Sequence, residues 1–95
     1  MNIAKAIRGK RRLRFTYDGQ SHVVEPHTFG MDRKGQMALR AYQLSGGSRS
    51  GEASGWKMFD AGAMRDVEVL AETFPYPHPG HRNAESAFWS IHVEL

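Results

Sequence analysis

Hydrophobic and polar residues alternate along several short stretches of the chain. The clearest case is RRLRFTY, residues 11–17, where Leu13, Phe15 and Tyr17 are separated by polar side chains. A period of two places successive side chains on opposite faces of a strand, so this stretch predicts a half-buried β-strand. Alternation or short apolar runs predict further strands at residues 22–25, 36–44, 56–59, 67–70 and 88–95.

Turn and helix signals separate these strands. Asp18-Gly19 suits the positive φ angles of a tight hairpin, and the segment from Asp32 to Gly35 predicts a second turn. Pro26 is expected to weaken strand pairing beyond Glu25. A short N-terminal helix is predicted with Asn2 as its N-cap, an apolar face of Ile3, Ala6 and Ile7, and Gly9 at its end.

Two C-terminal segments are less regular. PYPHPG, residues 75–80, is expected to be extended and turn-like, because proline fits neither a helix interior nor a central strand. FWSIHVEL, residues 88–95, predicts a final strand, although Phe88, Ile91 and Leu95 also fit one face of a helix.

These elements predict a mainly β fold in a single domain spanning residues 1–95. Five to six short antiparallel strands with hairpin turns, after one small helix, are typical of a compact β-barrel of the SH3-like or Sm-like type. The chain has 95 residues, of which 40% are hydrophobic, enough for one modest core.

Composition and charge indicate the cellular location of the protein and the class of partner it binds. No apolar run approaches a membrane span, no secretory leader is recognisable and cysteine is absent, so we expect a cytoplasmic protein without membrane contact. The formal net charge is +3, and five cations crowd into residues 8–14. Such asymmetry favours a phosphate-bearing partner, whereas long cations that merely solvate a strand face are the alternative.

Catalytic chemistry finds no support in the sequence. GSRSG, residues 47–51, has arginine where a nucleophile elbow needs serine. The same loop is not a phosphate-binding P-loop, because no Gly-Lys-Ser/Thr follows at the required distance. His78 and His81 lie three residues apart in a proline-rich turn without a third ligand, so no metal site or cofactor is predicted. His27 beside Glu25 is interpreted as a structural hydrogen-bonding pair. We therefore expect a protein that is not an enzyme.

Ligand binding has a clearer basis. Arg40 and Tyr42 share one face of a strand, and Trp56 and Lys57 begin the next strand. If the two strands pair antiparallel, a cation–aromatic cluster forms near the loop that joins them; arginine matches phosphate oxygens, and aromatic rings accept stacked bases. The predicted site residues are Arg40, Tyr42, Ser48, Arg49, Ser50, Trp56 and Lys57, with a secondary basic patch at Arg11, Arg12 and Arg14.

From about Ala6 to Phe74 the chain resembles the WYL domain family. The resemblance rests on the order of RRLRFTYDG, VEPH, LRAYQ, GGSRSG and GWKMF. It implies an Sm-like or SH3-like barrel that senses nucleic acids or nucleotide-like ligands within bacterial transcription regulators. By this likeness, Trp56 and Lys57 stand where the family commonly has an aromatic residue followed by arginine.

The chain also departs from the family pattern. The Trp-Tyr-Leu tripeptide that gives the family its name is Met37-Ala38-Leu39 in this chain, so its tryptophan and tyrosine are missing. Phe59 is followed by Asp60-Ala61, whereas the family often has an aspartate-arginine pair there. A second basic contact would then fall to Arg49 or Arg40. About ten residues precede the first strand, too few for a helix-turn-helix, so a stand-alone sensor or an accessory of a regulatory protein is expected.

Two hypotheses follow. The first is a binding module for a phosphate-bearing ligand, single-stranded nucleic acid or a nucleotide, linked to bacterial transcriptional or defence regulation. The second is a protein–protein interaction or homo-oligomerisation module that uses the C-terminal strand as an adhesive edge.

Overall fold

The short N-terminal helix and the first hairpin form where the sequence predicts them. In this computed structural model, which describes residues 2–47, 54–75, 77–81 and 87–95, α1 spans Ile3–Arg8 and ends at Gly9. Asn2 occupies the N-cap position without a side-chain cap hydrogen bond. Strands β1 (Arg11–Tyr17) and β2 (Gln20–Asp32) are joined by Asp18 and Gly19, with φ angles of 51° and 76°. Both angles suit the two-residue hairpin predicted for this pair.

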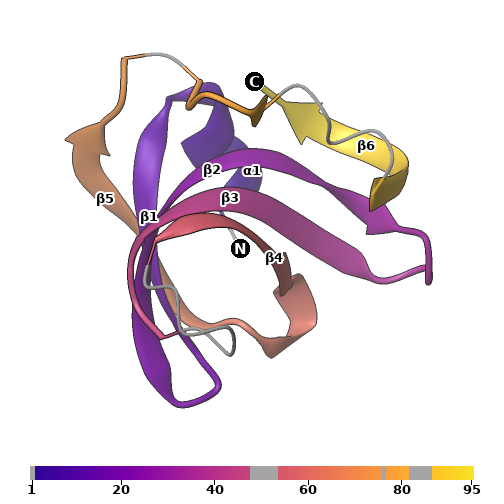
Figure 1. Cartoon of the computed structure of the whole chain (residues 1–95), viewed down its shortest axis with the longest axis horizontal. Helices are drawn as coiled ribbons and strands as arrows, with labels where there is room; N and C mark the ends of the chain where they lie inside the picture. The colour runs from indigo at the N-terminus through magenta and orange to yellow at the C-terminus, as the bar shows by residue number, and fades with distance from the viewer. Residues whose placement is uncertain (1, 48–53, 76, 82–86) are drawn as a thin grey trace.

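Four more strands follow along the chain. They are β3 (Met37–Ser45), β4 (Gly55–Asp60), β5 (Arg65–Thr73) and β6 (Phe88–Glu94), and the short 3-10 helix η1 (Ala61–Ala63) lies between β4 and β5. The final segment therefore forms a strand, as predicted, and not the alternative helix. Figure 1 shows the strands curving around one side of the molecule, with β6 running beside the C-terminal part of β2, to which it pairs antiparallel.

All six strands pair antiparallel in one sheet of order β4-β3-β2-β1-β5. The long strand β2 pairs with β3 along one edge, while β1 and then β6 share its other edge. The mainly β prediction of five to six antiparallel strands with a short helix is confirmed. Among the described residues no ladder joins β4 to β5, so the sheet is open and the predicted barrel closure is not confirmed.

The expectation that strand pairing weakens at Pro26 is wrong. Strand β2 runs through Pro26, which pairs with Ala41, and the next paired residue is Thr28 opposite Arg40. Two residues, His27 and Thr28, therefore face one residue of β3, which is a β-bulge. The bulge lets the strand continue past a residue that lacks an N–H donor.

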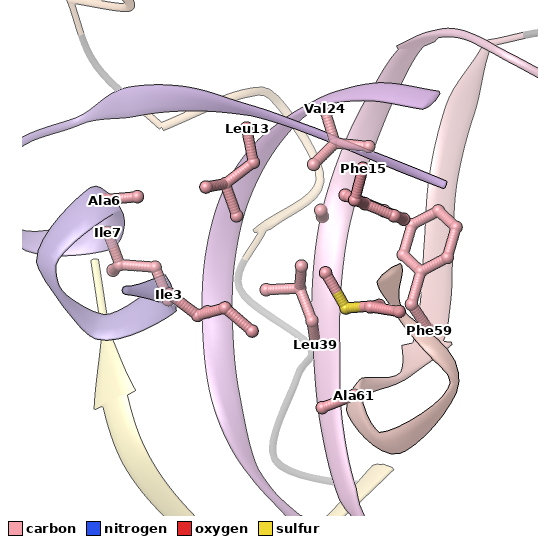
Figure 2. Close-up of a cluster of buried hydrophobic side chains, with 11 residues drawn as sticks. Ile3, Ala6, Ile7, Leu13, Phe15, Val24, Leu39, Phe59 and Ala61 are labelled. Carbon is pink, nitrogen blue, oxygen red and sulfur yellow. The ribbon is translucent and has the colours of Figure 1, made fainter. Parts of the chain in front are cut away.

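The core lies between α1 and one face of the sheet, called here the inner face. Figure 2 shows α1 directing its apolar side chains toward Leu13 and Leu39, with Phe15 and Phe59 at the far end. The Phe15 and Phe59 rings meet edge to face, with centroids 5.0 Å apart. The buried core residues are Ile3, Ala6, Ile7, Leu13, Phe15, Val24, Leu39, Ala41, Phe59, Ala61 and Met64. The radius of gyration is 12.0 Å, close to the ~12 Å expected for a compact domain of this length.

Gly30 allows β6 to approach β2 closely. A Cβ atom at this position would overlap the Ser90 carbonyl oxygen and come within 2.9 Å of the Ile91 Cα atom. We expect Gly30→Ala to lower the free energy of unfolding by about 2 kcal/mol, because backbone atoms must shift to admit the methyl group. Urea denaturation measures this change.

Gly62→Ala is the matched control for that substitution. Its added Cβ atom would make an ordinary contact, 3.4 Å from the Asp60 Oδ1 atom. We expect its effect on the free energy of unfolding to stay within about 0.5 kcal/mol. Equal destabilisation by the two substitutions would show that the close approach of β6 does not constrain residue 30.

Candidate functional site

A row of functional side chains crosses the outer face of the sheet, the face opposite the hydrophobic core. In the ladders, Glu25 of β2 is opposite Tyr42 of β3, and Tyr42 is opposite Trp56 of β4. Residues directly opposite in an antiparallel pair project from the same face. Arg12 of β1 extends the row, since its guanidinium nitrogen Nη2 lies 3.2 Å from the Glu25 carboxylate. Four strands thus bring a cation, a carboxylate and two aromatic rings together.

His27 is fully buried at the bulge of β2. Its Nδ1–H donates to the Glu25 carbonyl oxygen at 2.7 Å, and its Nε2 accepts from the backbone N–H of His78 at 2.9 Å. These two partners fix a neutral ring with its proton on Nδ1. Burial lowers the pKa of His27 to about 4, assisted by the nearby His81 and His78 rings and opposed by the hydrogen bond and charge of Glu25.

Residues 77–81, the covering segment, lie over this row. Trp56 Nε1 donates to the Pro79 carbonyl oxygen at 2.9 Å. The Arg40 guanidinium donates to the carbonyl oxygens of Gly80 and His81, each at 3.2 Å, and lies 4.0 Å from the Trp56 ring centroid. The segment after β5, orange in Figure 1, crosses above the sheet beside the C-terminus, consistent with the 3.3 Å contact between His81 Nε2 and the Leu95 carbonyl oxygen.

Imidazole rings pack against the aromatic rings of the row. The His78 ring stacks on Tyr42 with centroids 3.4 Å apart, and the His81 ring stacks on Trp56 at 5.9 Å. His27 meets Trp56 edge to face, with centroids 4.7 Å apart. We call these five residues the aromatic cluster: His27, Tyr42, Trp56, His78 and His81.

The Glu25 carboxylate is buried, with 5% of the residue exposed, and has side-chain partners on two sides. Arg12 pairs with Oε2 at 3.2 Å, and His78 Nδ1 lies 3.0 Å from Oε1. A buried carboxylate without partners would be costly, so these contacts tie the covering segment to β1 and β2.

The structure brings together three of the predicted ligand-binding residues and separates a fourth. Arg40, Tyr42 and Trp56 meet on the outer face. Lys57 is opposite Ala41, whose side chain belongs to the core. Because neighbouring residues of a strand project from opposite faces, Lys57 starts from the inner face while Trp56 starts from the outer face. Ser48, Arg49 and Ser50 lie outside the described residues.

Burial lowers the pKa of Arg40 from its usual value, while the Glu94 carboxylate acts in the opposite direction. Because the usual pKa of arginine is far above neutrality, the guanidinium remains charged. The cation at this site is thus permanent, unlike the imidazoles that surround it.

The secondary basic patch makes contacts within the chain. Arg12 forms an ion pair with Glu25, as described above. Arg11 Nε donates to the Leu70 carbonyl oxygen at 2.7 Å, and Arg14 pairs with Glu68 at 2.7 Å. Arg14 is about half exposed, which makes its ion pair weak and readily exchanged.

Sequence reasoning missed the role of the three histidines in the aromatic cluster. His27 does bond to Glu25, but through the backbone carbonyl, and its second partner is 51 positions away. The spacing of His78 and His81 in a proline-rich turn was the available signal. Among the described residues, no three His, Cys, Asp or Glu side chains are arranged to hold a metal ion.

A cleft of about 530 Å³ lies elsewhere, beside the β1–β2 hairpin and the described end of the glycine-rich loop. Tyr17, Gln20, His22 and Gly47 line it, together with Asp18, Met58 and Phe59. At its base, His22 Nδ1 lies 2.9 Å from Gln43 Oε1, and the Gln43 amide donates to the Gly47 carbonyl oxygen at 3.3 Å. The first residues of the loop are thus anchored to a buried polar pair.

Comparison of the chain with protein-family models, with curated proteins and with solved structures finds no match. No helix in the described ranges is long and apolar enough to cross a membrane.

The buried, neutral His27 predicts a specific dependence of stability on pH. Its pKa of about 4 in the folded protein is below the ordinary 6.5, so the unfolded chain binds more protons between these values. Stability is then complete above about pH 6.5 and is lost as the pH falls toward 4. From pH 7 to pH 5 we expect His27 to lower the free energy of unfolding by about 2 kcal/mol.

His27→Gln isolates this contribution from those of Glu25, His78 and His81, which face the ring. The glutamine amide oxygen preserves an acceptor for the His78 N–H and does not titrate. Urea denaturation at both pH values should show a smaller loss in the variant than in the wild type. The same loss in both proteins would mean that His27 does not carry the pH dependence.

Proposed function

We propose that this protein is a non-enzymatic binding domain for a phosphate-bearing ligand, single-stranded nucleic acid or a nucleotide, and that the outer face holds the site. The observation that carries the proposal is the Arg40 guanidinium lying 4.0 Å from the Trp56 ring, next to the stacked Tyr42 and His78 rings. Guanidinium groups pair with phosphate oxygens, and aromatic rings stack on bases. The outer face combines both kinds of group.

The architecture and the resemblance to WYL domains support the same proposal. The strands curve around one side of the molecule in Figure 1, and η1 connects the two end strands of the open sheet. We propose that this curvature belongs to an SH3-like or Sm-like barrel. By the same resemblance we propose a role in bacterial transcriptional or defence regulation, either alone or with a regulatory protein.

Salt dependence tests the phosphate contact. A fluorescein-labelled oligothymidylate should bind with an affinity that falls as salt rises, with a slope of log K against log salt near −0.7 for each phosphate contacted. Arg40→Gln should make this slope shallower by about one contact, because it removes the permanent positive charge beside Trp56. Fluorescence anisotropy across a salt series measures both slopes.

Arg33→Gln is the matched control, because Arg33 is an exposed arginine of the β2–β3 turn. It lowers the net charge by the same amount and should leave the slope unchanged. Equal slopes for the wild type and Arg40→Gln would exclude a phosphate contact at Arg40. A slope reduced equally by both substitutions would indicate diffuse electrostatics rather than a site.

An assembly module is the second candidate, and strand β6 favours it. Trp89 is 70% exposed and Ile91 is 37% exposed, although β6 carries no lysine, arginine or proline. Among the described strands β6 pairs only with β2. Edge strands without lysine or proline are prone to pair with another chain.

Mass in solution distinguishes this candidate. If β6 mediates assembly, the mass measured by analytical ultracentrifugation rises with concentration, and Trp89→Lys restores the monomer. The exposed Trp89 side chain makes this substitution tolerable for folding. A wild-type protein that stays monomeric at every concentration would eliminate the assembly role.

A further inference from the structure

The covering segment, residues 77–81, is held over the outer face by side chains rather than by a β-ladder. No backbone–backbone hydrogen bond joins it to another described segment. Pro77 and Pro79 have no N–H to offer a strand. Its attachments are instead Trp56, Arg40, Glu25 and His27, through the contacts given above. Releasing the segment would leave every strand pairing of the sheet intact.

The bonds to the covering segment use the donors that the proposed ligand requires. Carbonyl oxygens of Pro79, Gly80 and His81 accept from the Trp56 indole and the Arg40 guanidinium. Phosphate oxygens accept from these same donors, and the His78 ring occupies the Tyr42 face on which a base would stack.

We propose that the covering segment is an intramolecular competitor of the phosphate-bearing ligand, so that ligand binding at Arg40, Tyr42 and Trp56 displaces residues 77–81. This inference rests on the function proposed above and adds its regulation. Whatever stabilises the segment in place weakens ligand binding, and whatever releases it strengthens binding, because only the uncovered form is competent to bind.

The covered state contains an unfavourable feature that supports displacement. His81 Nδ1 is buried and has no hydrogen-bond partner among the described residues. An unmade hydrogen bond on a buried polar atom costs free energy, and release of the segment returns this atom to water. The remaining contacts must offset that cost, which narrows the free-energy gap between the covered and uncovered forms.

Gly80 provides a substitution that acts on the covering segment without replacing any of the ligand-binding residues. Its φ angle is +93°, and a Cβ atom there would lie 2.8 Å from Trp56 Nε1. Gly80→Ala therefore strains the turn and blocks its contact with the indole. Gly35→Ala is the matched control, because Gly35 has a φ angle of +84° and open space around its Cβ position.

The experiment uses a Trp89→Phe background, in which Trp56 is the single tryptophan. Acrylamide quenching of Trp56 should increase in Gly80→Ala and remain unchanged in Gly35→Ala. The labelled oligothymidylate should bind Gly80→Ala roughly ten-fold more tightly if the uncovered form is about a tenth populated in the wild type. Gly35→Ala should bind as the wild type does.

Hydrogen exchange on the wild-type chain gives a second, variant-independent readout. The His78 N–H, bonded to His27 Nε2, should exchange faster when oligothymidylate saturates the protein. Binding to wild type with an unchanged or slower exchange rate overturns the competition, even if Gly80→Ala fails to fold. Increased quenching in Gly80→Ala with equal or weaker binding also overturns it.

Failure of the proposed function has a different signature. If neither the wild type nor Gly80→Ala binds oligothymidylate or ATP at low salt while quenching shows Trp56 uncovered, the ligand class itself is wrong, and the competition falls with it. If the wild type binds with a steep salt slope but Gly80→Ala binds no more tightly, the function stands and the competition alone is refuted.

Discussion

The outer face of this protein depends on one buried imidazole. His27 donates to a carbonyl of its own strand and accepts from the backbone of residue 78. The bulge after Pro26 places it where no regular strand residue would be, opposite Arg40 together with Thr28. Protonation would replace its acceptor with a second donor and break the bond to His78. The position of the whole covering segment is thus coupled to the neutral state of a single ring.

Most of the fold follows from local sequence patterns. Alternation in β1, the Asp18-Gly19 turn and the apolar spacing of α1 are short-range signals, and each is realised. Two features escaped this reasoning for the same physical reason. The passage of β2 through Pro26 requires a bulge that only the partner strand reveals. The bonds from the covering segment to Trp56 and His27 span 23 and 51 positions.

The candidate site was predictable only in part. Arg40 and Tyr42 share a face by simple alternation, and antiparallel pairing of β3 with β4 brings Trp56 opposite Tyr42. The same alternation excludes Lys57, which is adjacent to Trp56 and so projects from the other face. The imidazoles of residues 78 and 81 could not be placed, because a proline-rich segment forms no internal hydrogen bonds and no strand ladder from which to infer a partner.

The two faces of the sheet are stabilised by different interactions, hydrophobic packing on the inner face and hydrogen bonds with ring stacking on the outer face. The inner face buries aliphatic and aromatic side chains, where exchange for another group would leave a cavity. On the outer face, the Trp56 and Arg40 donors bond to carbonyl oxygens and the Tyr42 ring stacks on an imidazole, and phosphate oxygens and a base are chemical equivalents of these partners. In the proposed competition, replacing these carbonyl acceptors with phosphate oxygens would leave neither the Trp56 nor the Arg40 donor unsatisfied. The core on the inner face would stay packed during this exchange, so the proposed ligand would bind and leave without unfolding of the domain.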